Sequence, residues 1–162
     1  MSDSIVTVDS SSVRAKLAKL SDALEHAALI ATRTAANAAA QKARASRLFV
    51  DRTGELRHSI QPHSGLVVRG GVGAMVLAAS KHAVFVEKGT RAHFITPRPG
   101  GMLRFQVRGH WVFARVVRHP GTKPRPFMNY AAVHGRTVLA SSLQAEVRRA
   151  LRGGGGFGGR VT

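Results

Sequence analysis

Histidine is the residue type of this chain with the most versatile chemistry, because an imidazole can bind a metal ion or transfer a proton near neutral pH. The eight histidines show neither an HExxH pattern nor close paired spacing: His26, His58, His63, His82, His93, His110, His119 and His134. The sequence contains no cysteine, which excludes a thiolate metal site and a disulfide framework. We therefore predict that the protein has no metal site and no cofactor.

A pair of acidic residues that could share catalytic work occurs at one place, where Asp51 and Glu55 stand close together. They lie at a predicted turn or helix start, where carboxylates are common because they interact favourably with free backbone N–H groups. No nucleophile, base and orienting group come together in the sequence. We expect no catalytic residues and no enzymatic activity.

A glycine-rich stretch, Gly70-Gly71-Val72-Gly73, suggests a third kind of chemistry, the binding of phosphate. It lacks the Lys-Ser/Thr pair that grips phosphate in such loops, and no helical pattern follows it. The flanking residues 65–69 and 74–78 instead have the composition of strands. The glycines therefore predict the turn of an antiparallel strand pair, not a nucleotide site.

The first element that the sequence predicts is a long helix. Its pattern begins after three serines, at residues 10–12, whose side-chain oxygens can act as the N-cap. It continues to about Ser46. Alanine dominates its second half, so its thin apolar stripe suits close packing against another helix, within the subunit or between subunits. The alternative is an ordinary core helix that is broken near residues 32–37.

Two further helices are indicated. Residues 83–86 predict a short helix that ends at Gly89, which can take the left-handed C-cap conformation. A last helix follows Pro126, has apolar residues at helical spacing, and ends in cations suited to a helix C-terminus, at Arg148, Arg149 and Arg152.

A hairpin is predicted from residues 102–107 and 111–117, and its register decides which face is buried. A two-residue Gly109-His110 loop pairs Val107 with Val112 and turns one apolar set to the core: Leu103, Phe105, Val107, Val112, Ala114 and Val116. A three-residue loop starting at Arg108 would instead pair Trp111 with Val107 inside. We prefer the first register, in which Trp111 and Phe113 lie on an exposed basic face. The candidate subunit-interface residues are Trp111, Phe113, Arg104, Arg108, Arg115 and Phe127.

The predicted fold class is α+β, with an antiparallel sheet of about four strands packed by a long N-terminal helix and a C-terminal helix. A chain of 162 residues can bury one sizeable core. We expect an N-terminal arm at residues 1–11, a single domain at residues 12–152, and a Gly-rich C-terminal tail at residues 153–162.

Charge is the outlying property, because 25 Lys and Arg against 8 Asp and Glu give a formal net charge of +17. Most of the excess follows residue 57, where Glu87 and Glu146 are the only acids. Such a field favours nucleic acid, an anionic membrane or an acidic protein as partner, unless the cations are simply solvated. No stretch approaches the roughly 18 to 20 apolar residues of a membrane span, and no secretory signal opens the chain, so we expect a soluble compartment.

Three motifs occur in order: Thr-Gly-Glu-Leu-Arg-His-Ser-Ile at residues 53–60, His-Ala-Val-Phe-Val-Glu-Lys-Gly-Thr at residues 82–90, and His-Pro-Gly-Thr-Lys-Pro-Arg-Pro-Phe at residues 119–127. In this order they resemble the small tail-component proteins of long-tailed phages, commonly called minor tail, neck or tail-completion proteins. The resemblance runs from residue 53 into the last helix. The long first helix and the Gly-rich tail fall outside it.

The resemblance implies an α+β subunit that assembles as a homo-oligomeric ring, of which a hexamer is one form. The ring would join the tail tube to the head connector and surround the genome DNA without sequence-specific contact. Its partners would be other neck and tail proteins with acidic surfaces, and its location the virion after assembly in the host cytoplasm, with no membrane. The alternative is a sequence-independent nucleic-acid-binding protein whose Trp111, Phe105 and Phe113 stack on bases.

Overall fold

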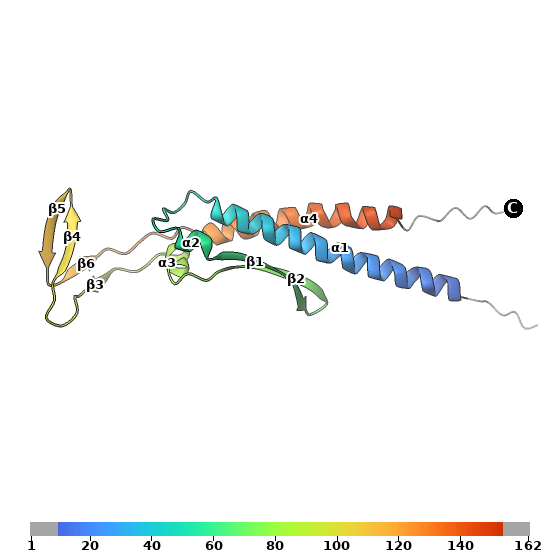
Figure 1. The fold of residues 1–162 in the computed structure, drawn as a ribbon, viewed down its shortest axis with the longest axis horizontal. Helices are drawn as coiled ribbons and strands as arrows, with labels where there is room; N and C mark the ends of the chain where they lie inside the picture. The colour runs from blue at the N-terminus through green and yellow to red at the C-terminus, as the bar shows by residue number, and fades with distance from the viewer. Residues whose placement is uncertain (1–9, 154–162) are drawn as a thin grey trace, which may run out of the picture.

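Two long helices run through most of the molecule, and a slender arm extends from one end of them (Figure 1). The computed structural model describes residues 10–153, so residues 1–9 of the predicted N-terminal arm and residues 154–162 of the predicted tail lie outside the described part. The start of the first helix and the end of the last helix lie at the end opposite the arm. In chain order the elements are α1 (Ser11–Arg44), α2 (Glu55–His58), β1 (Ile60–Val68), β2 (Gly71–Ala78), α3 (Ala83–Lys88), β3 (His93–Ile95), β4 (Leu103–Val107), β5 (His110–Ala114), β6 (Val117–His119) and α4 (Phe127–Gly153).

The alanine stripe of α1 packs within the subunit, mainly against α4. The two helices lie close together at Gly135, where an added Cβ would lie 2.9 Å from the Cβ of Ala39. The small side chains on both helices allow this approach, which confirms that the stripe packs on another helix. The helix is continuous through residues 32–37, and its N-cap residue Ser10 makes no side-chain cap hydrogen bond.

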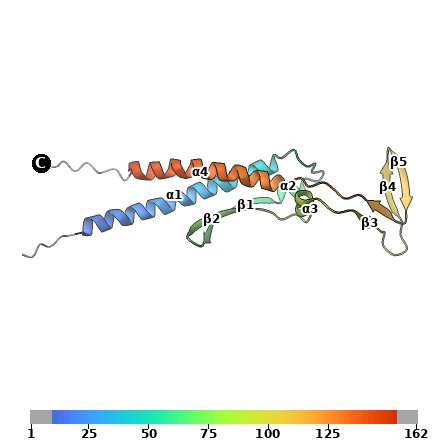
Figure 2. The ribbon, with the colours of Figure 1, turned by 180° about the vertical axis from the view of Figure 1, so that it is seen from behind.

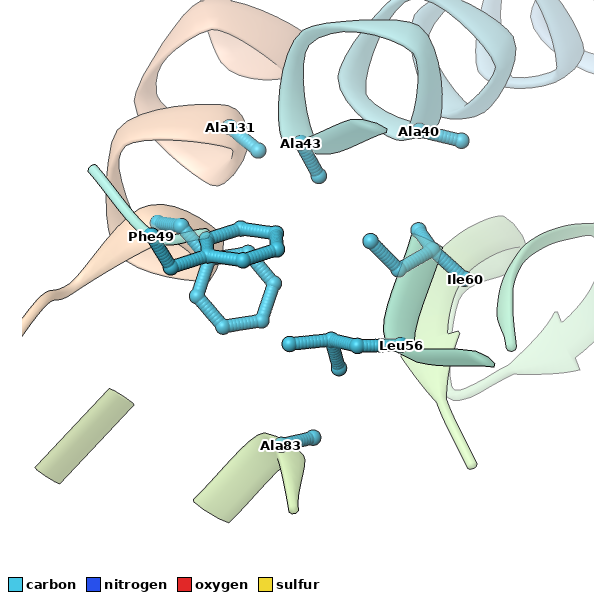
Figure 3. Packing of buried hydrophobic residues seen from close by; sticks show 8 residues of the cluster. Ala40, Ala43, Phe49, Leu56, Ile60, Ala83 and Ala131 are labelled. Carbon is cyan, nitrogen blue, oxygen red and sulfur yellow. The ribbon is translucent and has the colours of Figure 1, made fainter. Parts of the chain in front are cut away.

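A small hydrophobic core lies where the end of α1, the two short helices and the start of α4 meet (Figure 3). Phe49 and Phe127 form its aromatic centre, with ring centroids 4.7 Å apart and planes tilted by 58°. The remaining buried members are Ala40, Ala43, Leu56, Ile60, Ala83 and Ala131. Burial of each large side chain contributes about 1.5–3 kcal/mol to folding, so the few large members carry much of the stability.

The α+β class with antiparallel strands and two long helices is confirmed. The single sheet of about four strands is wrong, because the strands form three separate two-stranded ladders, β1 with β2, β3 with β6 and β4 with β5. The chain leaves the β1–β2 hairpin through α3 and enters residues 89–126, which we call the arm. The arm carries β3, β4, β5 and β6 away from the rest of the described chain, which we call the body (Figures 1 and 2). The predicted hairpin around Gly70 is confirmed, with Val68 opposite Gly71.

The β4–β5 hairpin has neither of the two registers that the sequence suggested. Val107 pairs with His110 and Phe105 pairs with Val112, so the turn consists of Arg108 and Gly109. Both turn residues have positive φ, 49° and 85°, as a type I′ turn requires to match the twist of the strands. Compared with the preferred register the pairing slips by two residues, so the division into two faces is kept. The expectation that one face joins the core is wrong, because the hairpin lies at the far end of the arm.

Candidate assembly interface at the arm and its root

The outer hairpin of the arm presents an aromatic and basic face. Phe113 lies directly opposite Arg104, and the Arg104 guanidinium stands over the Trp111 ring, 4.3 Å from its centroid. Trp111 is 54% exposed and Phe113 is 59% exposed. We call Trp111, Phe113 and Arg104 the arm face. Such a cation–π contact contributes about 0.5–1 kcal/mol at an exposed site, so it favours one arrangement of the two side chains.

The other predicted interface residues fall in different places. Arg108 occupies the type I′ turn, and Arg115 follows β5; both side chains are exposed. Phe127 is 1% exposed and packs against Phe49, so its inclusion among the interface candidates is wrong. It stands at the first position of α4 directly after Pro126, and the entry of the chain into the helix directs its ring into the core.

Further apolar side chains along the arm also remain exposed, although the contacts of the arm strands are mainly with one another. They are Phe94, Ile95, Met102, Val107, Val112 and Val116. Exposed apolar side chains that gather in one region of a soluble protein are typical of an interaction site. The arm is therefore a candidate surface for a covering partner.

A tight crossing holds the arm to the body. The backbone N–H groups of Thr90 and Thr122 donate to one another's carbonyl oxygens at 3.0 and 3.1 Å, and their Oγ1 atoms lie 3.1 Å apart. A Cβ at Gly89 would overlap the Thr122 carbonyl, and a Cβ at Gly121 would overlap the Thr90 carbonyl. Both glycines have positive φ, 71° and 86°. We call these four residues the arm-root clasp; only glycine fits at two of its positions.

The clasp is anchored to the last helix by Glu87. Its carboxylate accepts hydrogen bonds from the backbone N–H groups of Met128 at 2.9 Å and Asn129 at 3.1 Å, in the first turn of α4. A helix N-terminus has free N–H groups and a partial positive charge, so this carboxylate acts as its cap. Beside it the N–H of Arg125 donates to the carbonyl of Val86 at 2.9 Å. The helix ends at Gly89 as predicted, but the left-handed C-cap conformation is wrong: Gly89 has a φ of 71° and a ψ of −176°, which is outside the left-handed helical region.

The first motif, together with Asp51 just before it, completes this junction at the end of α1. Asp51 accepts from the N–H groups of Gly54 at 2.9 Å and Arg57 at 2.8 Å. The Arg57 guanidinium donates to the carbonyls of Arg44, Ser46 and Phe49 and stands 4.7 Å over the Phe49 ring. The acidic pair noted in the sequence therefore has structural partners: Asp51 caps α2 through backbone N–H groups, and Glu55 accepts from the Ser80 hydroxyl at 3.2 Å.

The arrangement of the histidines includes one feature that the sequence did not suggest. His93 and His119 face one another across the β3–β6 ladder, with ring centroids 5.0 Å apart. Within residues 10–153, no group of three or more His, Asp or Glu side chains is arranged to hold a metal ion. No described helix is long and apolar enough to cross a membrane.

The first motif, the second motif up to Gly89, α1 and the β1–β2 hairpin fall in the part of the chain that matches a known family. Residues 11–89 match the family described as Bacteriophage HK97-gp10, putative tail-component. The predicted resemblance to phage tail components is confirmed. The matched region includes the first helix, which the sequence placed outside the resemblance, and ends at Gly89, before the arm. No curated protein and no solved structure matches the chain.

Proposed function

We propose that this chain is a tail-completion or head–tail connector ring subunit, which joins the tail tube to the head connector of a phage and surrounds the DNA path. The observation that supports this best is the arm, which carries Trp111 and Phe113 away from the body. Both side chains remain more than half exposed in the isolated subunit. Aromatic side chains with Arg beside them are typical of interface centres. The arm would find its cover on a neighbouring molecule.

The position of the arm favours a head-to-tail contact between copies. The arm leaves one end of the long body, whereas the start of α1 and the end of α4 lie at the other end. Contact between two different surfaces of identical subunits is heterologous, and it generates a closed ring when the rotation between subunits closes. A ring, with a hexamer as one form, is the arrangement that encloses a DNA path.

The large positive charge fits neighbours in the neck better than tight contact with DNA. Contacts to phosphate are independent of sequence and strong at low salt, so a highly basic lumen would slow the passage of the genome. We therefore assign most of the +17 charge to acidic surfaces of other neck and tail proteins. The subunit would assemble in the host cytoplasm and remain in the virion.

The oligomeric state of the purified protein tests this function. Light scattering with size-exclusion chromatography and negative-stain microscopy should show concentration-dependent rings. The double variant Trp111→Ala/Phe113→Ala should lose them, because it removes the apolar part of the arm face. Tyr130→Ala is the matched control, since Tyr130 is an equally exposed aromatic residue on α4. A wild-type protein that stays monomeric at high concentration, or rings that survive the double variant, would contradict the proposal.

The alternative function, sequence-independent nucleic-acid binding, is separated by affinity for DNA at low and moderate salt. Tight, saturable binding with a steep salt dependence would favour this alternative, because each phosphate contact releases counterions. Weak DNA affinity together with ring formation would favour the neck subunit. The same Trp111→Ala/Phe113→Ala variant helps here, because loss of base stacking would weaken DNA binding without any ring being present.

A further inference from the structure

A groove of about 540 Å³ lies beside the arm-root clasp, between the segment that follows α1, the helix α3, and the two arm strands where they join the body. Phe49, Val50 and Phe85 supply apolar surface to it. Phe49 is buried and forms part of the core, whereas Val50 is 80% exposed and Phe85 is 55% exposed. We call this hollow the arm-root groove. Two large apolar side chains at its surface are available to a partner.

The charged side chains of the arm-root groove all carry the same sign. Lys123 and Arg125 line it together with His82, His93 and His119, and no acidic residue lines it. The side chains of Lys123 and Arg125 form no ion pair with any residue in the described range 10–153. The Arg125 backbone is nevertheless fixed, because its N–H donates to Val86. The groove therefore presents unpaired cations from a firmly held segment.

Two acidic residues that adjoin the groove-lining residues Val50 and Val86 in the sequence are already engaged within the subunit. Both Asp51 and Glu87 are occupied by backbone N–H groups, the first at α2 and the second at the start of α4. Moving either carboxylate toward the groove would leave those donors unsatisfied, at a cost of about 1–3 kcal/mol per group. Lys123 and Arg125 are exposed and therefore available to the carboxylates of another molecule.

We infer that the arm-root groove binds an acidic segment of a neighbouring tail or neck protein. An apolar side chain of that segment enters between Val50 and Phe85, and its carboxylates meet Lys123 and Arg125. This inference rests on the proposed function, since it names the place where an acidic partner docks. A second copy of the chain fits less well at this groove, because the chain offers only 8 Asp and Glu against 25 Lys and Arg. A phosphodiester backbone fits less well too, because it offers no apolar group for Val50 and Phe85.

Fluorescence anisotropy with a defined probe tests the inference. The probe is a fluorescein-labelled peptide, Glu-Glu-Phe-Glu-Glu-Leu with blocked ends, titrated with the full-length protein at low salt. We expect saturable binding, and binding about tenfold weaker for Lys123→Glu/Arg125→Glu, because two attractive contacts become repulsive. Phe85→Ala should also weaken binding, and replacing the peptide phenylalanine by alanine should have a similar effect.

The matched control is Arg14→Glu/Lys19→Glu, which changes the net charge equally at exposed positions on the first turns of α1. It should alter peptide affinity by less than about twofold, since screening removes long-range effects. Circular dichroism checks that each variant is folded, and Lys123→Gln/Arg125→Gln replaces the reversal pair should that pair not fold. Equal weakening by both reversal pairs, or no binding of the peptide to the wild-type protein, would overturn the inference.

Two further measurements separate the remaining outcomes. Short duplex DNA that binds more tightly than the peptide and depends on Lys123 and Arg125 would assign the groove to phosphate instead, and would overturn the inference. Ring formation is measured on the same samples. If rings form but peptide binding does not depend on Lys123 and Arg125, the groove proposal is wrong and the proposed function stands. If peptide binding depends on these residues but no rings form, the proposed function is wrong and the groove binds acidic segments in another context.

Discussion

The body and the arm use the same kinds of apolar side chain in opposite ways. In the body, Phe49 and Phe127 are buried against one another, and the alanines of α1 close onto α4. In the arm, Trp111 and Phe113 are more than half exposed, although the strands that carry them are regular. Backbone regularity without burial shows that the arm is held by its own ladder hydrogen bonds, while the body is held by packing.

This difference separates the stability of the subunit from its proposed assembly. Burial of apolar surface is the dominant favourable term in folding, and the arm contributes little of it in the isolated chain. The same surface becomes favourable when a second molecule covers it. Substitutions in the body should therefore change the free energy of unfolding, whereas substitutions in the arm should change association.

The largest expected effect comes from replacing a phenylalanine in the body and comparing it with the replacement of a phenylalanine in the arm. Phe127→Ala removes the centre of a small core and should lower the free energy of unfolding by roughly 3–5 kcal/mol, which is much of the stability of a small domain. Phe113→Ala should change it by less than about 0.5 kcal/mol, because the ring is solvated in the free subunit. Urea unfolding followed by far-UV circular dichroism measures both. Similar losses from the two variants would show that arm and body form one cooperative core.

The sequence predicted those parts of the body whose pattern is local. The helical spacing of α1 and α4, the glycine turn between β1 and β2, and the stop of α3 at Gly89 all depend on neighbouring residues. The arm faces were also divided correctly, because alternation along a strand survives a slip of two residues. The turn was misplaced since Arg108 takes positive φ, which is uncommon for a residue other than glycine, asparagine or aspartate.

What the sequence could not predict are the contacts between distant segments. The β3–β6 ladder joins two strands of three residues each across the whole outer hairpin, and no local pattern marks such short strands. Glu87 caps a helix that begins forty positions later in the chain. Phe127 was predicted to be an interface residue, because its contact with Phe49 joins two segments that are distant in the sequence. The three motifs were recognised as a set, but their meeting at the arm root follows from the fold alone.

A smaller effect is expected at the arm-root clasp, where the two regions join. Gly121→Ala should destabilise the protein by about 1–3 kcal/mol, because positive φ and overlap with the Thr90 carbonyl act together. Gly100→Ala is the matched control: Gly100 has a φ of 79° but no atom near its Cβ position, so its cost of about 1 kcal/mol isolates the backbone term. Thermal unfolding gives both values, and amide exchange at Thr90 and Thr122 shows whether the clasp has opened. Equal costs at the two glycines would mean that the crossing is loose.

The smallest effect tests whether the arm face is ordered without a partner. Trp111 is the only tryptophan of the chain, so its fluorescence reports on the arm, while far-UV circular dichroism is dominated by the helices of the body. Arg104→Gln removes the cation above the indole, an interaction worth about 0.5–1 kcal/mol at an exposed site. The Trp111 transition should therefore shift to lower urea concentration, and the helix transition should stay in place. Arg98→Gln, an exposed position in the loop before β4, is the control and should shift neither transition. If Arg104→Gln moved both transitions together, the arm and the body would unfold as one cooperative unit. The division into a body stabilised by packing and an arm whose apolar surface is covered only on assembly would then be wrong.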